Sequence, residues 1–401
     1  MTQQADSPPL PADAPSPARE HGEPSTGAPG MGRLIGLDLA RGLAVFGMYA
    51  VHVGPAPSQG GVIGFLMEPA HGRSSALFAF LAGFAVVLIT GRGTPKTGRA
   101  GRQAAAKVLI RAVILLALGT ALTLSGTPVE VILAFYGGYF LLVLPLYRLG
   151  AGPLAVIAAG TALVLPQVLY VVKQVLGDRG LPSPGEPDGP LSLLVTGSYP
   201  ALTWLPFVIA GMAVARLDLA STAVRVRLAL TGAALTVVGY GGSWPALHLV
   251  PGALVAIGAS GGGHPASAWG SDTAGFPFDD TPYWLPAASP HSETTLSILA
   301  NTGVAIAVVI ACLAAVDAFP RLRRLAGPVI TVGFMSLTAY VFHIVGIQFL
   351  GVEELPGSPL RVLVGFIVSA MAFAMLWSRY VSRGPLEWLM AKATGVARHV
   401  R

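Results

Sequence analysis

The run LIGLDLARGLAVFGMYAVHV, residues 34–53, decides the class of this protein. It is long enough for a membrane helix, because about 20 apolar residues cross the hydrocarbon core. Within it stand Asp38, Arg41 and His52, although a charged side chain at the centre of such a helix costs roughly 2.5–3.5 kcal/mol. A helix places Asp38 and Arg41 on one face as a structural ion pair. His52 lies about 16 Å further along the helix than Arg41, so we expect chemistry here as well as anchoring.

The composition extends this interpretation to the whole chain of 401 residues. Apolar residues make up 53% and charged residues only 11%, whereas a soluble domain has about 25% charged residues. The mean hydropathy is +0.66. We therefore predict an all-α, polytopic integral membrane protein. The net charge of +6 does not indicate a nucleic-acid partner, because the basic residues form short clusters between apolar runs. The single Cys312 excludes an intramolecular disulfide.

Apolar segments of membrane-spanning length recur along the chain. We count about ten transmembrane helices, at residues 34–53, 74–91, 108–125, 128–147, 152–172, 199–215, 228–244, 294–316, 328–350 and 361–379. The short apolar stretch 247–258 could be re-entrant, interfacial or an extension of the seventh segment.

The distribution of basic residues predicts the orientation. With the N-terminus in the cytoplasm, 20 of the 25 Lys and Arg residues fall on the cytoplasmic side, four fall outside and Arg41 lies in the membrane. The positive-inside rule then places both termini in the cytoplasm, in a multi-pass protein of the plasma (cytoplasmic) membrane. Residues 1–30, with seven prolines, are predicted to be a disordered cytoplasmic tail. Residues 383–401 are predicted to be a basic cytoplasmic tail.

Histidines gather on the predicted outer side. Four of them, at the ends or in the outer halves of different segments, are candidate catalytic residues: His52, His71, His291 and His343. A neutral imidazole near pH 7 can act as a general base or take an acyl group itself. Each could instead be an amphipathic interface residue, and this alternative is favoured for His248 and His264. No HExxH or similar spacing is present, so no metal site is predicted.

Three short stretches resemble the transmembrane acyltransferases. Residues 37–44 (LDLARGLA) are similar to their opening signature, and the spacing from Arg41 to His52 is similar to that of the O-acyltransferase branch. Residues 333–343 (GFMSLTAYVFH) and 73–83 (RSSALFAFLAG) resemble the heparan-α-glucosaminide N-acetyltransferase-like branch and its bacterial relatives.

The resemblance implies a transmembrane acyltransferase domain over residues 31–382. Such proteins move an acyl group, usually acetyl, from cytosolic acyl-CoA to a sugar hydroxyl or amine on the far side. The resemblance further implies a catalytic histidine in the first outer loop, where His71 is the only histidine. The co-substrate would be acyl-CoA, with no tightly bound cofactor, and the partners would be membrane lipids and an extracytoplasmic glycan or similar acceptor.

Supporting roles follow as hypotheses. Arg73, Ser292 and Trp204 could stabilise an oxyanion or orient the acceptor, although Trp204 also fits an interface belt. Five basic residues could bind the phosphates of acyl-CoA, or could serve only to set the orientation of the protein in the membrane. They are Arg99, Arg102, Lys107, Arg111 and Arg324.

Two other classes of function stay open. The first is a transporter or flippase for a small or lipid-linked solute, although the interiors of the predicted segments after the first contain no carboxylate for ion coupling. The second is a non-enzymatic scaffold or sensor, for which the four histidines would be dispersed over different faces.

Overall fold

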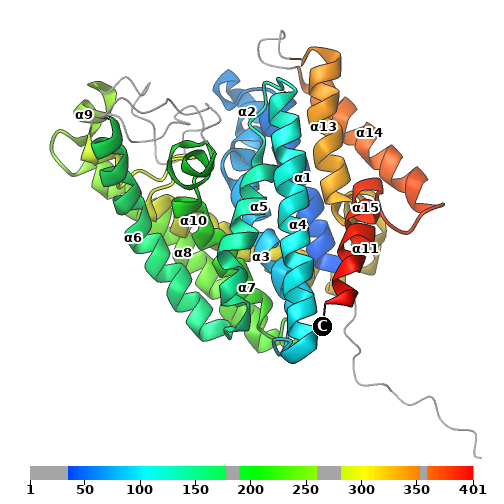
Figure 1. Ribbon diagram of the computed structural model, residues 1–401. Helices are drawn as coiled ribbons and strands as arrows, with labels where there is room; N and C mark the ends of the chain where they lie inside the picture. Colours follow the sequence, from blue (N-terminus) through cyan, green and yellow to red (C-terminus); the bar gives the residue numbers. More distant parts are fainter. Residues whose placement is uncertain (1–34, 178–188, 260–280, 353–358, 401) are drawn as a thin grey trace, which may run out of the picture. The chain divides into compact units, whose positions relative to one another are not determined.

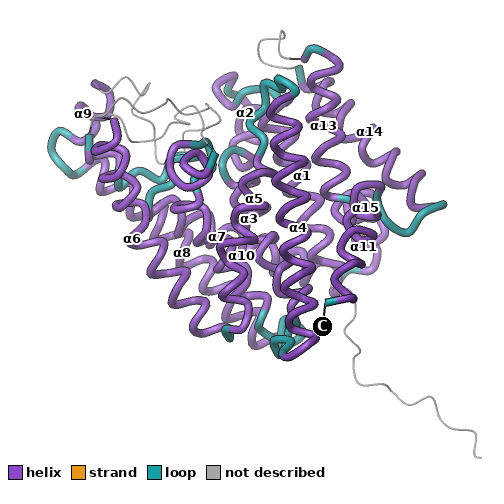
Figure 2. Tube along the Cα trace, viewed as in Figure 1, coloured by secondary structure: helices purple, strands orange, loops and turns teal. Residues whose placement is uncertain are grey.

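The computed structural model describes residues 35–177, 189–259, 281–352 and 359–400. These residues fold into helices joined by turns, with no strand among them (Figures 1 and 2). The helices are α1 (Ile35–Val53), α2 (Gly61–Met67), α3 (Arg73–Thr90), α4 (Gly98–Leu124), α5 (Ile132–Val143), α6 (Ala151–Gly177), α7 (Ala201–Ala215), α8 (Thr222–His248), α9 (Ala253–Ala259), α10 (Thr295–Ala318), α11 (Pro320–Leu325), α12 (Gly327–Phe334), α13 (Ser336–Leu350), α14 (Leu360–Ser378) and α15 (Pro385–Thr394).

The all-α, polytopic class is confirmed. In the described part of the chain, six helices are long and apolar enough to cross a membrane, and the bent pair α12–α13 raises the number to seven. The other three predicted segments also fold as helices, but α5 and α7 are shorter and α1 carries three polar or charged side chains. All ten predicted segments are therefore helical, while a count of ten spans and the side of each terminus remain predictions.

Several predicted boundaries and short segments look different in the structure. Helix α4 begins ten residues before the predicted 108–125, because its basic first turns continue the helix beyond the apolar run. The stretch 247–258 does not extend α8; a turn follows His248 and a separate helix α9 begins at Ala253. The predicted tail 1–30 lies outside the described residues. Within the predicted tail 383–401, α15 packs against α4.

Helix α1 lies at the centre of the packing and contacts α3, α10, α12, α13 and α14. Its closest neighbour is α12, and small residues allow this approach. A Cβ on Gly42 would overlap the Val329 carbonyl, and a Cβ on Gly333 would overlap the Asp38 carbonyl. The two backbones are therefore in direct contact, which fixes α12 against the helix that carries Asp38, Arg41 and His52.

The ninth predicted segment is broken rather than continuous. Helices α12 and α13 meet at Met335 with a bend of 89°. The bend frees the first backbone N–H groups of α13, which need partners outside the helix. Glu387 of α15 supplies them, because its Oε1 accepts from the backbone N–H of Leu337 at 2.8 Å and of Thr338 at 3.1 Å.

Candidate functional site

The structure brings His52 and His343 into direct contact. His52 stands in the last turn of α1 and His343 in the middle of α13, 291 residues later. Nδ1 of His52 lies 2.9 Å from Nε2 of His343. The two rings are nearly parallel, at 13°, with centroids 5.2 Å apart. This pair, which we call the histidine pair, forms because α1 and the α12–α13 arm contact each other along their lengths.

Aromatic rings enclose the His343 side of the pair. His343 is fully buried, with the Tyr49 ring 4.6 Å and the Tyr340 ring 5.1 Å from its own. The hydroxyl of Tyr49 donates to the carbonyl of Ala339 at 2.7 Å, and the hydroxyl of Tyr340 accepts from the backbone N–H of Ile132 at 3.2 Å. Because both hydroxyls are engaged elsewhere, the rings present apolar faces and edges to His343 and hold it in place.

The surroundings of His343 favour one arrangement of the protons in the pair. Its Nδ1 is buried and faces the carbonyls of Ala339 and Tyr340, without the alignment of a hydrogen bond among the described residues. Carbonyl oxygens favour a proton on Nδ1, which leaves Nε2 of His343 as the acceptor. In that arrangement Nδ1 of His52 would carry the proton between the rings, and Nε2 of His52 would keep its lone pair. His343 thereby orients His52 in the way that a third group orients a catalytic base.

His71 and His291 approach this pair from two loops. Gly72, whose φ of 68° suits glycine, is the residue before α3 and packs against Pro290, so the two loops touch. Both His71 and His291 lie close enough to His52 to act on it electrostatically. Outside the spanning helices, burial and then the neighbouring His71 lower the pKa of His291 to about 4, so its imidazole is neutral at physiological pH. The four candidate histidines thus belong to one neighbourhood.

The loop that carries His291 has a strained backbone. His291 and Glu293 have φ values of 57° and 55°, the left-handed region that residues other than glycine rarely adopt. The His291 ring lies 6.0 Å from that of Tyr199 and 6.2 Å from that of Trp204. Such strain persists only where the surroundings determine the conformation strongly, and it clusters at functional sites.

Glu293 is a site residue that the sequence analysis missed. Its side chain is buried, with Oε1 accepting from the indole N–H of Trp204 at 2.5 Å and Oε2 lying 2.5 Å from the hydroxyl of Thr203. Burial raises the pKa of Glu293, which precedes α10, to about 8, against the opposing effect of these two hydrogen bonds. The carboxyl group is therefore largely protonated at neutral pH.

The three residues proposed to stabilise an oxyanion have partners within the fold. Arg73 donates from Nε to the Tyr240 hydroxyl at 2.9 Å, and Tyr240 donates in turn to Asn301 at 2.9 Å. The hydroxyl of Ser292 donates to the Ala287 carbonyl at 3.2 Å, and the indole of Trp204 binds Glu293. In this structure these side chains support the loops around the histidines, and their proposed role toward an oxyanion stays untested.

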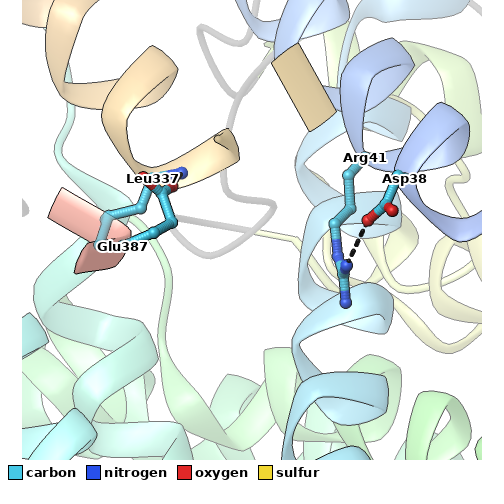
Figure 3. A network of polar contacts seen from close by, with 4 residues as sticks. All are labelled: Asp38, Arg41, Leu337 and Glu387. Carbon is cyan, nitrogen blue, oxygen red and sulfur yellow. Dashed lines mark hydrogen bonds and ion pairs between the residues drawn. The ribbon is translucent and has the colours of Figure 1, made fainter. Parts of the chain in front are cut away.

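A cavity lies at the other end of α1. It has a volume of about 120 Å³ and is lined by Arg41, Arg111, Ser336 and Tyr340, among mainly apolar side chains. Figure 3 shows the ion pair of Arg41 with Asp38, at 3.0 Å, as the sequence predicts. Tyr340 lines this cavity and also contacts His343. Tyr340 therefore connects the cavity lining to the histidine pair.

The other basic candidates lie away from this cavity lining. Arg99, Arg102 and Lys107 are exposed on the first turns of α4, and Arg324 is exposed on α11. Of the five residues proposed for acyl-CoA phosphates, the structure places only Arg111 in the cavity, where it interacts electrostatically with Arg41.

Among the described residues, neither His248 nor a metal centre belongs to the site. His248 is exposed and stacks on Trp244, 4.7 Å away, and His264 lies outside the described residues. Within the described ranges, no group of three or more His, Cys, Asp or Glu side chains is placed to hold a metal ion.

Comparison with known proteins gives one family match. Residues 273–397, less than half of the chain, are similar to DUF418, a family described as a protein of unknown function. This stretch contains His291, Glu293, His343 and Glu387. No curated protein matches the chain.

Proposed function

We propose that this protein is a membrane-bound acyltransferase. It would move an acyl group, acetyl in the simplest case, from cytosolic acyl-CoA to a hydroxyl or amine of an extracytoplasmic glycan or similar acceptor. The observation that carries the proposal is the 2.9 Å contact of His52 with His343, together with Tyr340, which contacts His343 and lines a cavity that Arg41 and Arg111 also line. The resemblance to the transmembrane acyltransferases at residues 37–44 and 333–343 supports the same reaction.

In the proposed reaction, Nε2 of His52 is the general base. It takes the proton of the acceptor O–H or N–H while the acceptor atom forms a bond to the thioester carbonyl carbon. The tetrahedral oxyanion then collapses, the C–S bond breaks, and the proton returns from His52 to the CoA thiolate. His343 holds the required tautomer throughout, and the positive charge on His52 exists only transiently. The alternative is an acyl-imidazole on His52 that the acceptor attacks in a second step.

The cavity would receive the acyl donor. Arg41 and Arg111 provide planar donors suited to phosphate or to the oxygen of a thioester. The apolar remainder of the lining fits an alkyl thioester arm. In the predicted orientation Arg41 lies nearer the cytoplasmic end of α1 and His52 nearer its outer end, which would suit a donor and an acceptor that arrive from opposite sides.

Single substitutions test the proposal in proteoliposomes supplied with radiolabelled acetyl-CoA inside and a panel of glycan acceptors outside. His52→Ala is expected to lower kcat by on the order of 100-fold or more, because general-base catalysis contributes about 10²–10⁴-fold. His343→Ala is expected to have a smaller effect in the same direction. His248→Ala, which removes an exposed histidine, is the matched control. Full acyl transfer by both site variants would refute the proposal.

One observation favours proton-coupled transport as a second candidate. Glu293 is a buried carboxyl group with a pKa near 8, and its partner Trp204 also contacts the ring of His291; transporters use buried carboxyl groups and imidazoles as proton relays. The same proteoliposomes separate the two functions. Labelled acceptor that requires acetyl-CoA favours the enzyme, whereas solute uptake driven by a pH gradient without CoA favours the transporter.

A further inference from the structure

Glu387 makes contacts to α13 that neither the family match nor the proposed reaction explains. Besides the two backbone N–H groups bound by Oε1, its Oε2 accepts from the Thr338 hydroxyl at 2.6 Å. The Thr338 hydroxyl also accepts from the backbone N–H of Leu386 at 3.1 Å. Four hydrogen bonds therefore join the first turn of α15 to the first turn of α13, around one carboxylate and one hydroxyl. Figure 3 shows Glu387 beside Leu337 at this junction.

The junction lies where α13 would otherwise have no partner for its first donors. The 89° bend at Met335 prevents α12 from continuing into α13, so the Leu337 and Thr338 N–H groups have no carbonyl of a preceding turn. A carboxylate is the strongest acceptor available for such donors, since it also interacts with the positive end of the helix dipole. Gly384 allows the close approach, because a Cβ there would contact Met335 and overlap the Glu387 carboxylate.

The orientation of α13 determines the position of His343. Thr338 and His343 are five residues apart, about 7.5 Å along the helix, and Tyr340 stands between them. Met390 of α15 is buried and lines the same cavity as Leu337 and Tyr340. Helix α15 is thus linked to the arm that carries His343 both by hydrogen bonds and by packing.

We propose that Glu387 is a positioning residue for the histidine pair: its carboxylate fixes the first turn of α13 and thereby the place where His343 meets His52. Glu387 touches neither imidazole and takes no proton from the substrate. The effect on catalysis rests on the proposed function, whereas the effect on α13 and on the exposure of His343 does not.

An alternative role for Glu387 would be that of a counter-ion. It interacts electrostatically with Arg111 on α4, and a charge pair needs only a negative group nearby. The two roles differ in what they require of the side chain. Positioning requires an acceptor oxygen at the reach of Glu, which Gln retains and Asp, shorter by one methylene, does not. A counter-ion requires charge, which Asp retains and Gln does not.

The experiment compares Glu387→Gln, Glu387→Asp and Glu387→Ala in the full-length protein, with Asp317→Asn as the control. Asp317 is exposed at the end of α10, where it forms an ion pair with Arg225 at 2.7 Å. Hydrogen–deuterium exchange of residues 336–340 and carbethoxylation of His343 by diethylpyrocarbonate, both read by mass spectrometry, report on α13 without any assay of activity. Acyl transfer is measured in parallel.

We expect Glu387→Ala and Glu387→Asp to raise amide exchange at 337–338 by on the order of 10-fold or more, since each loses hydrogen bonds to a charged acceptor. Both should expose His343 to the reagent and lower kcat by roughly 10- to 100-fold through misplacement of the pair, with KM for the acyl donor nearly unchanged. Glu387→Gln and the control should stay within a few-fold of wild type in all three measurements.

Two results would overturn the inference. One is unchanged exchange and His343 reactivity in Glu387→Ala. The other is that Glu387→Asp preserves these properties better than Glu387→Gln, which would show that Glu387 acts as a counter-ion for Arg111. If the wild-type protein transfers no acyl group, the proposed function fails, yet the exchange and modification data still decide whether Glu387 positions α13.

Discussion

Replacing Glu293 by Gln should remove a pH dependence of stability that the loop before α10 creates. Gln keeps the shape of the protonated carboxyl group and can accept from the Trp204 indole as Glu293 does. Its amide can donate to the Thr203 hydroxyl, which also donates to the Pro200 carbonyl at 3.2 Å. We therefore expect the variant to fold like the wild type near pH 6, and to differ from it only where Glu293 would ionise.

The direction of this pH dependence follows from the pKa values of Glu293 and His291. The folded pKa of Glu293, about 8, is above its ordinary 4.5, so the unfolded chain loses this proton first and stability falls as the pH rises from 4.5 to 8. The folded pKa of His291, about 4, is below its ordinary 6.5, so stability rises over pH 4 to 6.5 and partly cancels the first effect. Of these two groups only Glu293 contributes from pH 6.5 to 8, which amounts to roughly 2 kcal/mol over 1.5 pH units.

The assay is thermal unfolding of wild type and Glu293→Gln in detergent, at half-unit steps from pH 6 to 9. Their difference in Tm should change by on the order of a few degrees between pH 6.5 and 8, in favour of the variant at higher pH, and then level off. Contributions of all other groups cancel in the difference. Asp317→Asn, an exposed acid exchanged in the same way, should show no such change. A difference that stays constant across this range would refute a buried, protonated Glu293.

Two further predictions concern packing. Tyr240→Phe should lower the free energy of unfolding by roughly 1–3 kcal/mol, because it leaves Arg73 and Asn301 without their shared hydroxyl. Denaturant unfolding measures this change, and an effect below about 0.5 kcal/mol would contradict the prediction. Gly83→Ala should push α3 and α7 apart, since the new Cβ would overlap the Val208 carbonyl. We expect Tm to fall by on the order of several degrees. An unchanged Tm would show that the two helices can move apart at no cost.

The helices could be predicted from the sequence because each contains an apolar run of membrane-spanning length. The bend at Met335 could not, because residues 328–350 contain no Asp, Glu, Lys or Arg and no proline lies at the break, so the segment is predicted as one span. A tertiary contact stabilises it, because α15 supplies an acceptor to the N–H groups of Leu337 and Thr338. Glu387 lies in a stretch that composition marks only as basic, so nothing local points to it.

Part of the candidate site could be predicted from the sequence. The motif around Arg41 and the intramembrane His52 and His343 stand out as costly residues in apolar helices, and the structure places the two imidazoles together. Glu293 does not stand out, because it falls just before an apolar segment, where acidic residues are ordinary. Its burial depends on α7 and on a loop in a left-handed conformation that the residue types do not predict.

The glycine contacts between α1 and α12 have a mechanical consequence. The backbones of α1 and α12 touch at Gly42 and Gly333, so these two helices are held firmly together. His52 belongs to α1. His343 lies beyond the bend at Met335, on α13. A rotation about this bend would change the distance between the two imidazoles, but it would also have to break the hydrogen bond from Tyr49 of α1 to the Ala339 carbonyl of α13, so the same contacts that bring the histidines together also hold them there.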